Sequence, residues 1–149
     1  MSARHIGALC LLAGIMAALA CDVVWAQMFE CFGSWSVQTR LVAASDATNP
    51  TYRPGDLRVE QWDIRQSGAA LQLTTQAGTI AGAVGPNYTL VFASAWDTGL
   101  GVTSDIRIEA RMTSSASMAG TIKVNYYSAQ FGYQVGLDAW TFQAIRVGG

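Results

Sequence analysis

The sequence predicts an all-β protein, an antiparallel up-and-down barrel of about eight strands, with a β-sandwich as the alternative. Three observations support this fold class. Apolar and polar residues alternate along residues 62–92 and again along 102–113, as in strands with one buried face. Short glycine-containing breaks separate the alternating segments, as expected of tight hairpins. No segment after residue 26 shows the apolar period of a helix.

Residues 1–26 are predicted to be a secretory signal peptide. A short basic start with Arg4 precedes the uncharged, mostly apolar run 6–20, and small residues follow it. This run is shorter than the roughly twenty residues that a membrane-spanning helix needs. The small residues at its end favour cleavage after Ala26, which gives a periplasmic or secreted protein.

A second interpretation of the leader stays open. Residues 18–21, Ala-Leu-Ala-Cys, are similar to a bacterial lipoprotein box in which Cys21 is acylated, although the usual leucine stands one position late. Lipidation would hold the chain at a membrane surface rather than through it. This is the only case in which we expect a membrane partner.

Residues 27–149 are predicted to form one domain, and their composition excludes several function classes. The whole chain has ten Asp and Glu against nine Lys and Arg and no basic stripe, which argues against a nucleic-acid partner. The only histidine, His5, lies in the predicted leader. Ser-His-Asp catalysis, Cys-His catalysis and the usual zinc sites are therefore not expected. We expect no enzyme activity, no cofactor and no metal.

Cys31 is the only cysteine that remains after cleavage at residue 26. It is either a buried small apolar residue or a thiol that pairs with another molecule. If processing retained Cys21, a bridge between the two cysteines would be a third alternative. The sequence leaves these alternatives open.

The first strand is expected within residues 29–42. Trp35, Val37 and Leu41 share one face, and Thr39 is a polar exception on that apolar side.

Residues 43–56 are expected to be a long loop, because Asn49-Pro50 and Pro54-Gly55 interrupt any strand there. Such a loop is a place where a protein partner can bind. Tyr52 and Arg53 are residue types that are common at interaction hot spots.

The second strand is expected at residues 57–66. Leu57 and Val59 alternate in one phase, whereas the apolar residues from Trp62 onward alternate in the other. One extra residue in a strand produces such a slip, so we expect a β-bulge or a sharp bend near Glu60.

The remaining strands follow at short intervals, separated by turns rich in glycine and serine. They are expected at residues 70–75, 79–84, 88–94, 102–113, 118–127 and 139–146.

Four short motifs lie on these strands: Gly33-Ser34-Trp35, Trp62-x-Ile64-x-Gln66-x-Gly68, residues 117–122, and Trp140-x-Phe142-x-Ala144-x-Arg146. With them the chain resembles the lipocalin-like, calycin-type barrels of small exported bacterial proteins, over nearly the whole of 27–149. The resemblance implies that Trp35 closes one end of the barrel and that Arg146 lies across its ring, a cation–π contact. No C-terminal helix is expected, unlike in true lipocalins, so avidin-like and inhibitor barrels are the nearer comparison.

The predicted function is that of a non-enzymatic exported binding module whose ligand is a small apolar molecule or a protein. The aromatic residues expected to line a ligand cavity are Trp62, Trp96, Tyr126 and Phe142. The same four residues would equally suit a filled core. The alternative function is a protein-interaction or inhibitor barrel that acts through the 43–56 loop and has no ligand cavity.

Overall fold

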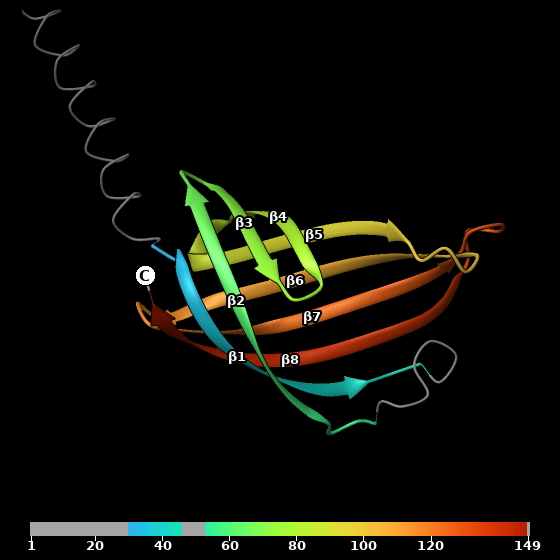
Figure 1. Ribbon diagram of the computed structural model, residues 1–149, viewed down its shortest axis with the longest axis horizontal. Helices are drawn as coiled ribbons and strands as arrows, with labels where there is room; N and C mark the ends of the chain where they lie inside the picture. The colour runs from blue at the N-terminus through green and yellow to red at the C-terminus, as the bar shows by residue number, and fades with distance from the viewer. Residues whose placement is uncertain (1–29, 46–52, 149) are drawn as a thin grey trace, which may run out of the picture. The chain divides into compact units, whose positions relative to one another are not determined.

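The computed structural model describes residues 30–45 and 53–148. In these residues eight antiparallel strands pair in sequence order, and β1 also pairs with β8, which closes the sheet into a barrel (Figure 1). The strands are β1 (Gly33–Ala43), β2 (Leu57–Ser67), β3 (Ala70–Thr75), β4 (Gly78–Val84), β5 (Thr89–Asp97), β6 (Val102–Ser114), β7 (Ser117–Ser128) and β8 (Gln134–Gly148). The predicted up-and-down barrel is confirmed, and the sandwich alternative is wrong.

The predicted signal peptide, its cleavage after Ala26 and the alternative lipidation at Cys21 lie outside the described residues. Within the part of the chain that the structure describes, the only helical segment is the short 3₁₀ turn η1 (Pro86–Tyr88) between β4 and β5. No helix there is long and apolar enough to cross a membrane.

The up-and-down topology places the connections between strands at two ends of the barrel. The closed end carries Cys31, the β2–β3, β4–β5 and β6–β7 connections and the last residues of β8. Among the described residues, the open end carries 44–45, 53–56, 76–77, 98–101 and 129–133. Each strand turns alternate side chains inward, so both ends are lined by one residue in two from every strand.

The closed end is filled by a layer of aromatic and polar contacts. Arg146 Cζ lies 5.0 Å from the ring centroid of Trp35 and 5.8 Å from that of Phe32, so the pair that the resemblance implied is in contact. The Trp35 indole N–H donates to the carbonyl oxygen of Cys31 at 3.0 Å. The backbone N–H and the thiol of Cys31 both donate to Gln66 Oε1, at 3.1 and 3.2 Å.

Cys31 is a free and fully buried thiol. Burial disfavours the thiolate and raises the pKa of Cys31 from 9.0 to about 11, against the smaller opposing effects of a backbone hydrogen bond and of Arg146. Because the thiolate is the reactive form of cysteine, the structure favours a buried small residue over a thiol that pairs between molecules.

The pairing of β2 with β1 keeps a single register from Leu57 to Ile64. The β-bulge expected near Glu60 is therefore absent, and that part of the prediction is wrong. The sharp bend that was its alternative stays a prediction. Leu57 and Val59 face outward and are 54% and 71% exposed, which turns Arg58 and Glu60 toward the barrel interior. The change of phase in the sequence therefore marks a change in the inward residues of β2, from polar at Arg58 and Glu60 to apolar at Trp62.

Candidate functional site

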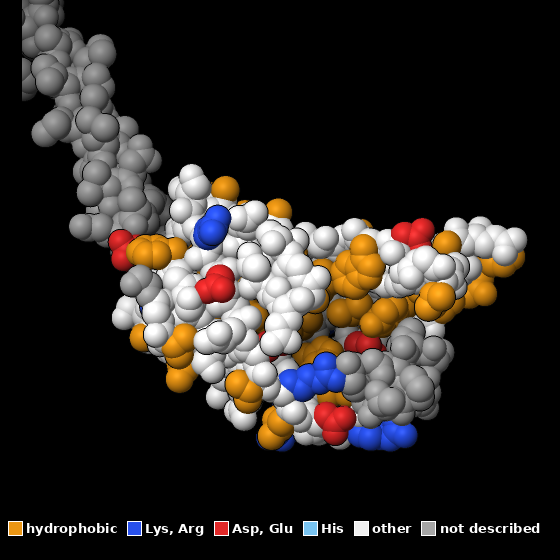
Figure 2. Space-filling model, in the orientation of Figure 1, with side chains coloured by type: hydrophobic (Ala, Val, Ile, Leu, Met, Phe, Trp, Pro, Cys, Tyr) orange, Lys and Arg blue, Asp and Glu red, His pale blue; other side chains and the backbone are white. Residues whose placement is uncertain are grey.

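A cavity of about 530 Å³ occupies the open half of the barrel. This volume lies within the range of about 300–1,000 Å³ that is typical of small-molecule sites. All eight strands of the described barrel contribute side chains to its wall. Figure 2 shows the molecular surface hollowed here, with hydrophobic side chains inside the hollow. The barrel is therefore filled at one end and open at the other.

The floor of the cavity is Trp62 on β2. Its backbone pairs with that of Trp35, which belongs to the filled end, and its side chain is only 1% exposed. The ring of Phe142 packs against it, with 4.9 Å between centroids and a 59° tilt. Apolar side chains from β6 and β7, such as Ile108 and Ile122, continue the wall from this floor. The inner part of the cavity is thus largely apolar.

Three of the four aromatic residues expected to line a cavity do so: Trp62, Trp96 and Tyr126. Phe142 does not line it. Its side chain is 3% exposed and belongs to the core beneath Trp62. All four aromatic side chains were expected to line the cavity. Their position along the barrel axis decides which of them do, because the cavity occupies only the open half.

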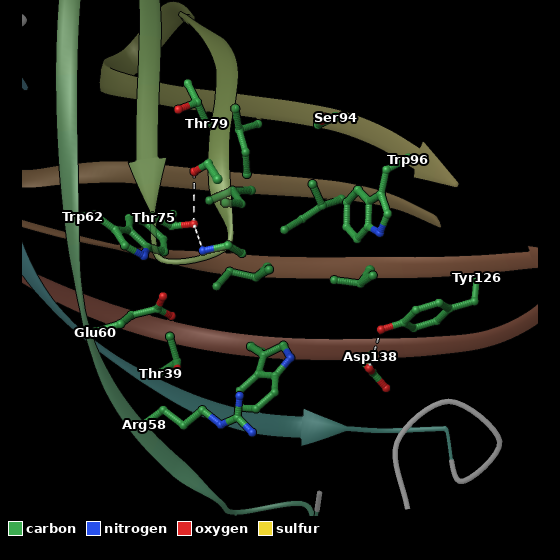
Figure 3. Close-up of a pocket in the computed structure, with 18 residues that line it drawn as sticks. Thr39, Arg58, Glu60, Trp62, Thr75, Thr79, Ser94, Trp96, Tyr126 and Asp138 are labelled. Atoms are coloured by element: carbon green, nitrogen blue, oxygen red, sulfur yellow. Dashed lines mark hydrogen bonds between the residues drawn. The ribbon is translucent and has the colours of Figure 1, made fainter. Parts of the chain in front are cut away.

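A buried carboxylate stands in the wall of the cavity on β8. One oxygen of Asp138 accepts from the Tyr126 hydroxyl at 2.9 Å (Figure 3), and the other accepts from the backbone N–H of Ser45 at 3.1 Å. The side chain is only 3% exposed. Because both oxygens already accept hydrogen bonds, Asp138 fixes the Tyr126 ring and ties the end of β1 to β8.

Polar residues on β1 and β2 form the opposite part of the wall. Thr39, Arg58 and Glu60 line the cavity, and Arg58 Cζ lies 5.2 Å from the ring centroid of Trp140, a cation–π contact. None of these four residues was among the predicted site residues. The signal that could have identified the first three is their place in the alternation: Thr39 shares the phase of Trp35, and Arg58 and Glu60 share the phase of Trp62.

The floor residue also carries an unsatisfied polar atom. The indole N–H of Trp62 is buried and has no hydrogen-bond partner among the described residues. Ser104 Oγ, on the inward face of β6 beside Trp96 and Tyr126 in the register, is in the same condition. Buried polar groups are rarely left unpaired in folded proteins, so both atoms are notable.

The open end is bordered by exposed apolar side chains on two hairpin tips. Leu100 is 86% exposed, and Phe131 and Tyr133 are 67% and 61% exposed with their rings stacked at 6.0 Å. The backbone N–H of Ala129 donates to the carbonyl oxygen of Gly101 at 2.9 Å, which joins the two tips.

Only residues 43–45 and 53–56 of the predicted 43–56 interaction loop are among the described residues. Arg53 is exposed, and its backbone N–H donates to Asp56 Oδ2 at 2.9 Å. Tyr52 lies outside the described residues, so the pair stays a prediction. The alternative function was a protein-interaction barrel that acts through this loop and has no ligand cavity. Its second part is wrong, because the barrel has a cavity.

The described residues contain no group of three or more His, Cys, Asp or Glu side chains arranged to hold a metal ion. The cavity has the volume to enclose a small molecule.

No protein-family model matches the sequence, and no curated protein matches it significantly. Among solved structures, the chain is similar to that of EF1p2_mFAP2b bound to DFHBI, with 18% sequence identity, a TM-score of 0.46, and coverage of 76% of this chain and 91% of that chain. At this level the likeness bears on neither the ligand nor the activity of the present protein.

Proposed function

We propose that this protein is a non-enzymatic binding protein that holds a small, largely apolar molecule in the open half of its barrel. The observation that carries the proposal is the cavity of about 530 Å³, with an apolar floor and an exposed apolar rim. Burial of apolar ligand surface contributes about 25 cal/mol per Å², so such a wall suits a mostly hydrocarbon ligand. The absence of histidine after residue 5 supports a function without catalysis.

The proposal is tested by titration with N-phenyl-1-naphthylamine, an uncharged apolar dye whose fluorescence rises in apolar surroundings. A double variant, Ile106→Trp with Val124→Trp, narrows the cavity, because the two residues line it and pair across β6 and β7. We expect saturable binding to the wild type and affinity at least about tenfold lower in the variant.

The matched control places the same two substitutions outside the barrel. Leu57→Trp with Val59→Trp adds two indoles to the outward face of β2, and this variant should bind the dye as the wild type does. Failure of the wild type to bind, or equal binding by the narrowed variant when circular dichroism shows it folded, would contradict the proposal.

We also propose that the protein acts after export. The support is the pattern of the leader, with its basic start, apolar run and small residues. Intact mass spectrometry of the protein from its own cells should give a chain that starts at Gln27. A chain that starts at an acylated Cys21 would instead favour the membrane-anchored alternative, and an uncut chain would contradict export.

A further inference from the structure

We propose that the cavity selects apolar molecules that carry an uncharged hydrogen-bond acceptor, such as a carbonyl oxygen, and that this acceptor is bound by the Trp62 indole N–H. The inference rests on the proposed function and deepens it, because it names the ligand class of the same cavity. Trp62 lines the cavity, is 1% exposed, and its Nε1 has no partner among the described residues.

An indole N–H can only donate a hydrogen bond, so an acceptor is what this atom lacks. Buried donors are nearly always paired, because an unpaired one has given up its hydrogen bond to water without replacement. Another buried indole of the core shows the usual arrangement: Trp35 Nε1 donates to the carbonyl oxygen of Cys31. Trp62 differs from Trp35 in lining the cavity, where a ligand can supply the acceptor.

Trp62 is one of the residues that line the cavity. Phe142 packs against its ring with 4.9 Å between the centroids. Figure 3 shows the ring nitrogen on the side that faces Glu60. Glu60 and Trp62 are alternate residues of β2 and therefore share its inward face.

The charges near Trp62 favour an uncharged acceptor over an anion. Glu60 stands two residues away on the same face, about 7 Å along the strand. Its negative charge disfavours a second negative charge nearby. Arg58 is four residues from Trp62, about 13 Å along the strand, and its guanidinium lies over the ring of Trp140. An anion on Trp62 would thus lie nearer to Glu60 than to the cation.

Ile80, Ile108 and Ile122 are among the apolar side chains of the cavity wall. Of Trp62 and Ser104, whose buried polar atoms have no partner among the described residues, only Trp62 lines the cavity. One polar point in an apolar surface fixes the orientation of a ligand without raising the cost of desolvating it. We therefore expect a ligand with a single buried acceptor and otherwise hydrocarbon surface.

The test compares two rigid molecules of nearly the same shape, 9-fluorenone and fluorene, of which only the first has a carbonyl group. Competition with the naphthylamine dye gives both affinities for the wild type, for Trp62→Phe and for Trp35→Phe. Trp62→Phe keeps an aromatic floor and removes the donor. Trp35→Phe removes an indole N–H that does not line the cavity.

We expect the wild type to bind fluorenone about five- to tenfold more tightly than fluorene, the range of one neutral hydrogen bond. Trp62→Phe should bind both compounds equally, whereas Trp35→Phe should keep the preference. A second readout needs no substitution of the floor: the carbonyl stretching band of fluorenone in the wild-type complex should shift to lower frequency, as in a hydrogen-bonded ketone.

The outcomes separate this inference from the proposed function. Equal binding of both compounds to the wild type, or an unshifted carbonyl band, would overturn the inference and leave the cavity as a binding site. A preference that persists in Trp62→Phe would also overturn it. If neither compound and no dye bound the wild type, the proposed function itself would fail, and the inference with it.

Discussion

The thiol of Cys31 lies in the filled end of the barrel, where burial raises its pKa from 9.0 to about 11. In the unfolded chain this thiol loses its proton near pH 9, whereas in the folded protein it keeps the proton until about pH 11. Between these values the unfolded state binds fewer protons than the folded state. The free energy of unfolding therefore falls as the pH rises, and the contribution of Cys31 is fully present only below about pH 9.

We predict that the wild type loses about 2 kcal/mol of stability between pH 9 and pH 11 relative to Cys31→Ala, since one pKa unit corresponds to about 1.4 kcal/mol. Urea unfolding of both proteins across this pH range measures the difference. The comparison cancels the pH effects of the other residues, because both proteins contain them. If the stability of the two proteins changed in parallel with pH, the result would contradict the burial of the Cys31 thiol.

Among the elements, β7 approaches its neighbours most closely at Gly120. A Cβ atom at this position would meet the backbone carbonyl oxygen of Glu109 and would lie 2.8 Å from both Ala110 Cα and a ring carbon of Phe142. Two of these three atoms belong to the backbone of β6 and cannot rotate away. The glycine lets the strands curve over the filled end.

We therefore predict that Gly120→Ala destabilises the protein by about 2–3 kcal/mol, measured by urea unfolding. Gly85→Ala is the matched control. Gly85 has a φ of −99°, which any residue adopts, and a Cβ there would come no closer than 3.6 Å to Thr89. This control should change stability by no more than about 0.5 kcal/mol in either direction. Similar losses in both variants would contradict the close approach.

The single register of β2 leads to a second prediction at this scale. Val59→Lys should change stability by less than about 0.5 kcal/mol, because that side chain faces water. Ile64→Lys on the same strand should cost more than about 3 kcal/mol, because it buries an unpaired charge. Thermal or urea unfolding of both variants would test this. A large loss of stability in Val59→Lys would contradict the single register of β2 and favour a bulge near Glu60.

Most strands could be predicted from the sequence, because each buries one face and alternates visibly. The exceptions have physical causes. β8 begins at Gln134, earlier than the expected residue 139, because its first residues pair with the end of β7 although they lack regular alternation. On β2 the alternation is inverted, with Val59 outside and Glu60 inside, because a cavity wall does not need apolar residues.

The candidate site was harder to predict than the fold. Trp62, Trp96 and Tyr126 were found because aromatic residues are common in cavity walls, yet Phe142 satisfied the same rule and lies in the core. Sequence alternation reports whether a side chain faces inward but not how deep it lies, and depth follows from the register between strands. Polar residues in an inward phase, such as Thr39, are a sharper indicator.

At the scale of the whole molecule, the barrel interior has two parts: a filled end that stabilises the fold and an open half that contains the cavity. The filled end holds large, fully buried side chains, including Trp35 and Phe92. The open half leaves about 530 Å³ beside it. This division explains how a domain without a disulfide among its described residues can keep an unfilled cavity.

A molecule that binds the folded barrel but not the unfolded chain must stabilise it. We predict that the naphthylamine dye at 100 times its dissociation constant adds about 2.7 kcal/mol to the free energy of unfolding, and raises the transition temperature by several degrees. The variant Ile106→Trp with Val124→Trp, with at least about tenfold lower affinity, should gain no more than about 1.4 kcal/mol at the same dye concentration. Differential scanning calorimetry measures both, and an equal shift in the two proteins would place the dye outside the cavity.

The most direct test of the central claim, that the cavity holds a small apolar molecule, is native mass spectrometry of the protein from the cells that make it. The wild type and the narrowed variant should be purified side by side. We predict an added mass on the wild type that is lost on denaturation and is missing from the variant. The same added mass on both proteins, or none on either, would contradict the claim.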